Sequence, residues 1–118
     1  GDGGMPPVDF DPDVHYEGRF VVAPAPSLGC PPASYSFSEL RMTIVGEELR
    51  ITADRFTLIQ NPRPTGNMFD ASSTADANCN PVRLVGSFSD SNLLSATWTA
   101  MCSGFCGNQT REIVGERR

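Results

Sequence analysis

Four cysteines carry the most recognisable chemistry in this chain of 118 residues: Cys30, Cys79, Cys102 and Cys106. An even number of cysteines in a short chain is typical of a disulfide framework made outside the reducing cytoplasm. We favour the pairs Cys30 with Cys79 and Cys102 with Cys106, because the second pair can close a tight loop, but the sequence leaves the other connectivities open. On a loop-entropy model the long bridge contributes about 4 kcal/mol and the short one about 2 kcal/mol.

Three other uses of the cysteines depend on their spacing or on the residue that follows them. A zinc site needs closely spaced ligand pairs, and Cys102 and Cys106 form such a pair whereas the other two cysteines stand alone. A redox-active pair normally has two residues between its sulfurs, and Cys102-Ser-Gly-Phe-Cys106 has three. The residue after Cys106 is Gly107, not the histidine that covalent haem attachment requires. Structural disulfides are therefore the prediction.

Asp9, Asp11 and Asp13 have the alternate spacing of the oxygen ligands in a calcium-binding loop. The rest of that pattern is missing, because Val14 stands where the loop needs glycine and Phe20 stands where it needs a bidentate glutamate. We expect a solvated acidic segment here and predict no metal site.

Groups suited to catalysis are few. His15 is the one histidine and no nucleophile motif accompanies it, so we expect an ordinary surface residue. All nine basic residues are arginines, which excludes a Schiff-base lysine and the lysine of a phosphate-binding loop. Paired carboxylates are the glycosidase alternative, and the candidates are Glu39, Glu47, Glu48, Asp54 and Asp70. Nothing marks two of them as facing each other, so we predict a non-enzymatic protein without catalytic residues or a cofactor.

The net charge of −5 argues against nucleic acid and anionic membrane surfaces as partners, because both favour a basic face. No run approaches the ~18 apolar residues of a membrane-spanning helix. Together with the cysteines, this predicts an extracytoplasmic protein, whether periplasmic, secreted or at the cell surface. A lipid anchor preceding residue 1 stays open.

The chain divides by composition into an arm and one domain. Residues 1–15 are rich in Pro, Gly and Asp and are predicted to form an extended N-terminal arm, which we expect to contact a protein partner. The apolar residues available for that contact are Met5, Val8, Phe10 and Val14. Residues 16–118 are predicted to form a single β-barrel domain.

Alternating apolar and polar residues predict seven or eight short strands in that domain. The segments are 16–22, 40–45, 49–53, 55–60, 68–74, 82–89, 94–100 and 111–114, with a single helical turn weakly indicated at 36–39. Sequential hairpins favour a small antiparallel up-and-down barrel stapled by disulfides, with a sandwich as the alternative.

The inward residues of such a barrel either fill it or line a cavity for one small ligand. Large side chains at most inward positions favour a filled interior. If a small apolar ligand is held instead, we expect Met42, Phe88 and Trp98 to line its site, because the small residues Gly86, Ala96 and Ala100 would open space beside Trp98.

The segment Gly86-Ser-Phe-Ser-Asp90, followed by 94–100 with a central Trp98, resembles the strand-turn-strand units of small exported lipocalin-like barrels. Such domains are common in bacterial lipoproteins, so the resemblance implies a lipocalin-like carrier or sensor of a small apolar ligand. Arginine without lysine, with abundant Pro, Ala and Gly, suits a GC-rich bacterial genome.

The function we expect is that of a non-enzymatic exported β-domain, an accessory or structural binding subunit of a larger extracytoplasmic or cell-surface assembly. The lipocalin-like carrier is the first alternative. A small secreted enzyme that uses surface carboxylates is the second.

Overall fold

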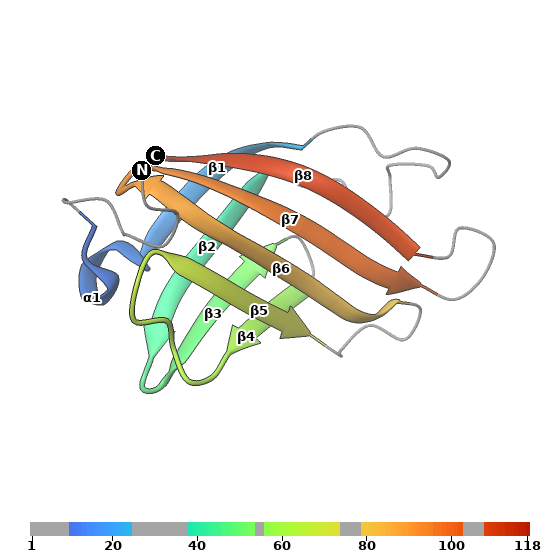
Figure 1. Cartoon of the computed structure of the whole chain (residues 1–118), viewed down its shortest axis with the longest axis horizontal. Coiled ribbons are helices and arrows are strands. Elements are labelled where there is room, and N and C mark those ends of the chain that lie inside the picture. Colours follow the sequence, from blue (N-terminus) through green and yellow to red (C-terminus); the bar gives the residue numbers. More distant parts are fainter. Residues whose placement is uncertain (1–9, 25–37, 54–55, 74–78, 103–107) are drawn as a thin grey trace.

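Eight antiparallel strands close into a barrel in the computed structural model, which describes residues 10–24, 38–53, 56–73, 79–102 and 108–118. Each strand pairs with its neighbours in sequence order, and the last pairs back with the first (Figure 1). The elements are α1 (Pro12–His15), β1 (Gly18–Pro24), β2 (Glu39–Val45), β3 (Glu48–Ala53), β4 (Phe56–Gln60), β5 (Met68–Ser73), β6 (Cys79–Asp90), β7 (Leu93–Cys102) and β8 (Asn108–Arg117). The predicted all-β barrel is confirmed, and the sandwich alternative is wrong.

The strands follow from the alternation in the sequence. In β3, for example, Leu49, Ile51 and Ala53 are buried while Arg50 and Thr52 are exposed. A period of two places one set of side chains inside a closed sheet and the other outside.

The connections alternate between the two ends of the barrel. Gly46, at the turn between β2 and β3, has a φ of 62°, a left-handed conformation that glycine adopts without strain. This turn, the β4–β5 connection and the β6–β7 turn lie at the end that carries α1, on the left in Figure 1. We call it the helix end, and the opposite end the far end.

Two strands, β6 and β8, extend furthest beyond the predicted segments. β8 covers Asn108–Arg117, where the sequence indicated only 111–114, and β6 begins at Cys79 rather than at residue 82. Asn80 and Pro81 suggested a turn, but a register shift between Cys79 and Val82 accommodates them within the strand. The helical turn expected at 36–39 lies partly outside the described residues, and Glu39 belongs to β2.

Of residues 1–15, predicted to form an extended arm, the structure describes 10–15, and Pro12–His15 form the short helix α1. Asp11 caps α1 by accepting a hydrogen bond from the Asp13 N–H at 2.9 Å, and Pro12 occupies the first turn, where it is favoured. Phe10 and Tyr16, on either side of this turn, are buried in the barrel core. The apolar residues of this segment therefore anchor it to the barrel.

One close approach shapes the barrel wall. Gly86 on β6 pairs with Ala96 on β7, and a Cβ atom built at Gly86 lies 2.6 Å from the Ala96 Cβ and 2.5 Å from the Ser95 carbonyl oxygen. No side chain larger than hydrogen fits there without a shift of the backbone. The sequence suggested open space at this position, and the structure shows close backbone contact instead.

Candidate functional site

The three residues predicted to line a ligand site all lie inside the barrel, and two of them, Phe88 and Trp98, belong to different ring clusters. Met42, Phe88 and Trp98 are buried. The ring of Phe88 packs at the helix end, whereas Trp98 contacts Phe56 with 5.4 Å between ring centroids. Two aromatic clusters therefore fill different levels of the barrel.

The cluster at the helix end is built around Phe88. Its ring centroid lies 4.8 Å from Phe10, 5.4 Å from Tyr16, 5.6 Å from Phe20 and 6.0 Å from Phe69. Phe10 is only 9% exposed, so its predicted role as a free partner-contact residue is corrected. Edge-to-face contacts of this kind add to the burial of the rings themselves. These aromatic rings thus fill the helix end of the barrel.

Arg117, at the end of β8, covers this cluster of aromatic rings. Its guanidinium stacks on the Phe20 ring, 4.6 Å from the centroid, and donates to the carbonyl oxygens of His15 at 2.7 Å and Ser91 at 2.8 Å. It also donates to the Glu17 carbonyl. Burial lowers the pKa of Arg117 from its ordinary value, but arginine keeps its charge at neutral pH. The contact joins the N-terminal segment, the β6–β7 turn and β8.

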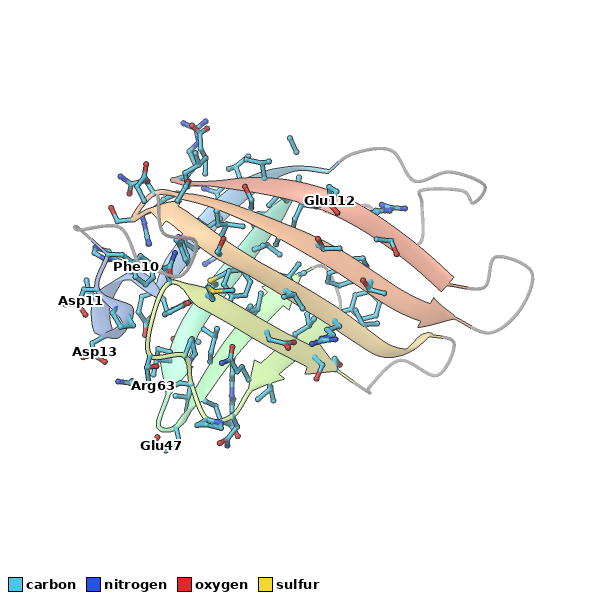
Figure 2. All side chains as sticks on the ribbon, in the orientation of Figure 1. Phe10, Asp11, Asp13, Glu47, Arg63 and Glu112 are labelled. Atoms are coloured by element: carbon cyan, nitrogen blue, oxygen red, sulfur yellow. The ribbon has the colours of Figure 1, made fainter. Side chains whose placement is uncertain are left out.

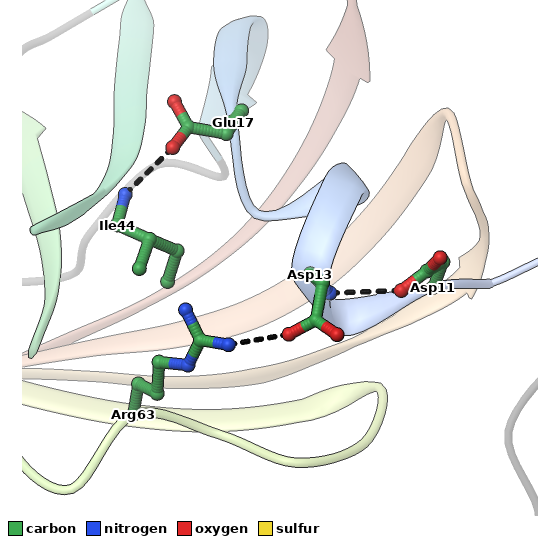
Figure 3. Close-up of polar contacts among 5 residues, drawn as sticks. All are labelled: Asp11, Asp13, Glu17, Ile44 and Arg63. Carbon is green, nitrogen blue, oxygen red and sulfur yellow. Dashed lines mark hydrogen bonds and ion pairs between the residues drawn. The ribbon is translucent and has the colours of Figure 1, made fainter. Parts of the chain in front are cut away.

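Polar contacts between α1 and the neighbouring connections complete the helix end. Figure 3 shows Asp13 paired with Arg63 of the β4–β5 connection, and the Glu17 carboxylate accepting from the Ile44 N–H. The second Glu17 oxygen accepts from the Thr43 hydroxyl at 3.0 Å. Asp11 and Asp13 therefore serve as a helix cap and an ion-pair partner. Asp9 lies outside the described residues.

The part of the barrel interior around Trp98 also contains a buried arginine. Arg111 pairs in register with Trp98 and is 3% exposed, and Ser73 of β5 is the other buried polar residue that the described ranges contain. The sequence analysis did not assign Arg111 to the interior. Alternation could have done so, because Ile113, two residues later, is a core residue.

The outer surface of β5 to β8 and β1 carries an unbroken uncharged row. Direct register pairs link Met68 to Ser87, Ser87 to Ser95, Ser95 to Val114 and Val114 to Ala23. We call these five residues the neutral strip. Met68 is 59% exposed and Val114 is 49% exposed, so its apolar atoms face solvent.

Two shallow grooves lie along the neutral strip. One is lined by residues that include Met68, Ser87, Ser95 and Glu112, and the other by residues that include Ala23 and Val114. Glu112, labelled on β8 in Figure 2, borders the strip and accepts a hydrogen bond from the Thr97 hydroxyl at 3.1 Å. The strip therefore exposes apolar and hydroxyl groups side by side along two shallow grooves.

Some carboxylates on the rest of the described outer surface are paired with arginines. Arg83 on β6 binds Asp70 on β5 through two contacts, one of 2.8 Å between Nε and Oδ1. These hydrogen bonds lower the pKa of Asp70. Glu39 accepts from Arg19, and this contact lowers the Glu39 pKa in the same way. Both shifts favour the ionised form, whereas a general acid needs a raised pKa.

The structure also gives the positions of His15 and of two of the other candidate carboxylates. Glu47 is exposed in the β2–β3 turn, Glu48 pairs with Arg50 at 3.1 Å, and Asp54 lies outside the described residues. His15 ends α1, where its Nδ1 accepts from the Asp11 N–H at 2.8 Å. Its contacts are those of a local structural residue.

Several of the remaining predicted residues lie outside the residues that the structure describes. Cys30, Cys106, Met5 and Val8 lie outside the described residues, and for Cys79 and Cys102 the structure gives the backbone position. Val14 on α1 is 57% exposed and stays available for a partner contact. No group of three or more His, Cys, Asp or Glu side chains that could hold a metal ion occurs within the described ranges.

Comparisons of the chain with protein-family models, with curated proteins and with solved structures found no match. In the part of the chain that the structure describes, no helix has both the length and the apolar character needed to cross a membrane.

Proposed function

We propose that this chain is a non-enzymatic binding domain, an accessory or structural subunit that docks on a protein partner outside the cytoplasm through the neutral strip. The observation that carries the proposal is the strip itself, an uncharged row across five strands with Met68 and Val114 largely exposed. Burial of the exposed Met68 and Val114 side chains against a partner would stabilise a complex, because it removes apolar area from water.

The packed interior supports the same proposal. Among the described residues, eleven large side chains have less than 2% of their area exposed, including Trp98, Tyr16, Phe20 and Phe56. A barrel filled in this way is a stiff support, because close-packed interiors resist deformation. Binding through its outer surface needs no rearrangement of the core.

Substitutions on the strip test this proposal. The double variant Met68→Arg/Val114→Arg places two charges on the strip, at exposed positions where the barrel itself is expected to tolerate them. The matched control is Thr52→Arg, at an exposed position on β3, a strand not among the five that carry the strip. Each protein is expressed in the cells that make it, purified gently, and sized by light scattering after gel filtration.

We expect the wild type and Thr52→Arg to elute in an assembly well above the 12.7 kDa of the single chain, and the double variant to elute as a monomer. Circular dichroism checks that all three fold alike. Assembly of the double variant at wild-type size, or a monomeric wild type, would refute docking through the strip.

The lipocalin-like carrier is the second candidate, and Arg111 is the observation that favours it. A charged guanidinium beside Trp98 inside a sequentially wound eight-stranded barrel suits an amphipathic ligand with an acidic group. Trp98 is the single tryptophan, so its fluorescence reports directly on this level of the barrel. Saturable quenching or enhancement by oleate, abolished in Arg111→Met, would support the carrier, and an unchanged spectrum would count against it.

A further inference from the structure

Cys79 and Cys102, separated by more than twenty residues in sequence, occupy directly opposite positions in the β6–β7 ladder. Cys79 is the first residue of β6 and Cys102 is the last residue of β7, so the pair lies at the far end of the barrel. The sequence analysis instead favoured pairing Cys79 with Cys30 and Cys102 with Cys106.

Directly opposite residues of antiparallel strands have Cα atoms about 4.5 or 5.5 Å apart and lie on the same face of the sheet. A disulfide requires Cα atoms about 4.4 to 6.8 Å apart. We propose that Cys79 and Cys102 are joined by a cross-strand disulfide that fastens the open end of the β6–β7 hairpin.

The backbone pairing of β6 with β7 is irregular next to the two cysteines. Its register shifts between Cys79 and Val82, so regular pairing is interrupted there. Pro81 lies within the interruption and has no N–H to donate to the partner strand. A covalent link just beyond the irregularity holds together a strand end that the backbone hydrogen bonds support only in part.

The bond forms by thiol–disulfide exchange with an external disulfide, either a small-molecule disulfide or a disulfide oxidoreductase. One cysteine thiolate attacks the external disulfide, forms a mixed disulfide and releases one thiol. The second cysteine thiolate then attacks the mixed disulfide and releases the other thiol. The two cysteines are oxidised, the external disulfide is reduced, and the two protons pass to the released thiols.

Peptide mapping distinguishes this bond from the pairing favoured by spacing. The protein is isolated from its source without reductant, its free thiols are alkylated, and it is digested with trypsin. Cleavage after arginine, but not before proline, leaves three cysteine peptides: 20–41 with Cys30, 56–83 with Cys79, and 84–111 with Cys102 and Cys106.

We expect peptide 56–83 to be linked to peptide 84–111. A second digestion after Phe105 separates the last two cysteines, and the fragment with Cys102 should stay attached to the fragment with Cys79. Peptide 56–83 linked only to 20–41 would overturn the proposal. So would a link from Cys79 to Cys106, or alkylation of Cys79 and Cys102.

A thermal measurement tests the same bond independently. In oxidising buffer the double variant Cys79→Ser/Cys102→Ser should melt on the order of 10 °C below the wild type. With both proteins reduced by dithiothreitol, the two melting temperatures should agree to within about 2 °C. Equal melting temperatures in oxidising buffer, or a difference that survives reduction, would contradict the bond.

Discussion

Arg117 joins parts of the chain that lie far apart in sequence. It binds carbonyl oxygens about 26 and 100 positions away in sequence and covers the ring of Phe20. An arginine in a charged C-terminal run reads from sequence as a solvated residue. Its role depends on which backbone oxygens the fold brings near it, and local pattern contains no information about those.

Tyr16 should make the folding stability of the protein fall at alkaline pH. Its hydroxyl is buried and donates to the Gly66 carbonyl oxygen at 2.8 Å, and burial raises its pKa above the ordinary 10.0. A raised pKa stabilises the fold below pH 10 and loses that contribution as pH rises above it, because the unfolded chain ionises first. Tyr16→Phe should cost about 1 kcal/mol at neutral pH and unfold less steeply with pH above 10.

Urea unfolding at pH 7, 10 and 11 measures this difference. The stability lost by the wild type between pH 7 and 11 should exceed that lost by Tyr16→Phe. Parallel losses in the two proteins would show that Tyr16 ionises as readily in the folded state as in the unfolded chain.

Asp70 should have the opposite effect at low pH. Its hydrogen bonds to Arg83 lower its pKa below the ordinary 3.8, so they stabilise the fold above that pH. The contribution is lost as pH falls through the lowered folded value. The wild type should therefore be slightly more stable than Asp70→Asn at pH 7, and the gap should shrink toward pH 2. The effect is small, because both side chains are exposed.

Chemical denaturation of both proteins between pH 7 and 2 tests this sign. A gap that stays constant, or widens, as the pH falls would show that the ion pair does not act through the charge of Asp70.

Among the elements, α1 depends on its anchors more than on its length. Four residues are too few to be helical alone, and Phe10 and Tyr16 hold the turn against the core. Phe10→Ala should therefore lower the unfolding free energy by about 3 kcal/mol, since it removes a buried ring. Val14→Ala, at an exposed position of the same helix, should change it by less than about 0.5 kcal/mol.

Equilibrium unfolding followed by Trp98 fluorescence measures both variants. A Phe10→Ala protein as stable as the wild type would restore the original expectation of an arm that hangs free of the barrel.

The β6–β7 hairpin should tolerate no side chain at Gly86. A Cβ there meets the Ser95 carbonyl oxygen and Ala96, both parts of the neighbouring strand. Gly86→Ala should destabilise the fold by roughly 1–3 kcal/mol through overpacking. Gly66→Ala, where the added Cβ meets nothing within 4 Å, is the control and should be nearly neutral. Equal stability of the two variants would show that the strands separate easily at Gly86.

The predictability of these elements depends on the range of the contacts that define them. The β2–β3 hairpin was predicted closely because its alternation and its turn at Gly46 are local. The burial of Phe10 was missed because its partners, such as Phe88, lie far along the chain. The full length of β8 was missed because 108–110 and 115–117 show no apolar alternation in the sequence, and only pairing with both β7 and β1 extends the strand over them.

At the scale of the whole molecule, closure of the barrel gives the surface its character. Pairing of β8 with β1 removes exposed strand edges and places Ala23 beside Val114. The neutral strip exists only because of that closure and of the registers of β5 to β8. The sequence does not show that Met68 and Val114 lie in one row, because no local pattern encodes the strand registers.

Native mass spectrometry of the wild-type protein, purified gently from its source, tests the central claim that this barrel acts by docking on a protein. We expect a complex heavier than the 12.7 kDa of the single chain, and we expect the added mass to be that of a protein. A monomer that carries an added mass of a few hundred daltons, or a bare monomer, would contradict it.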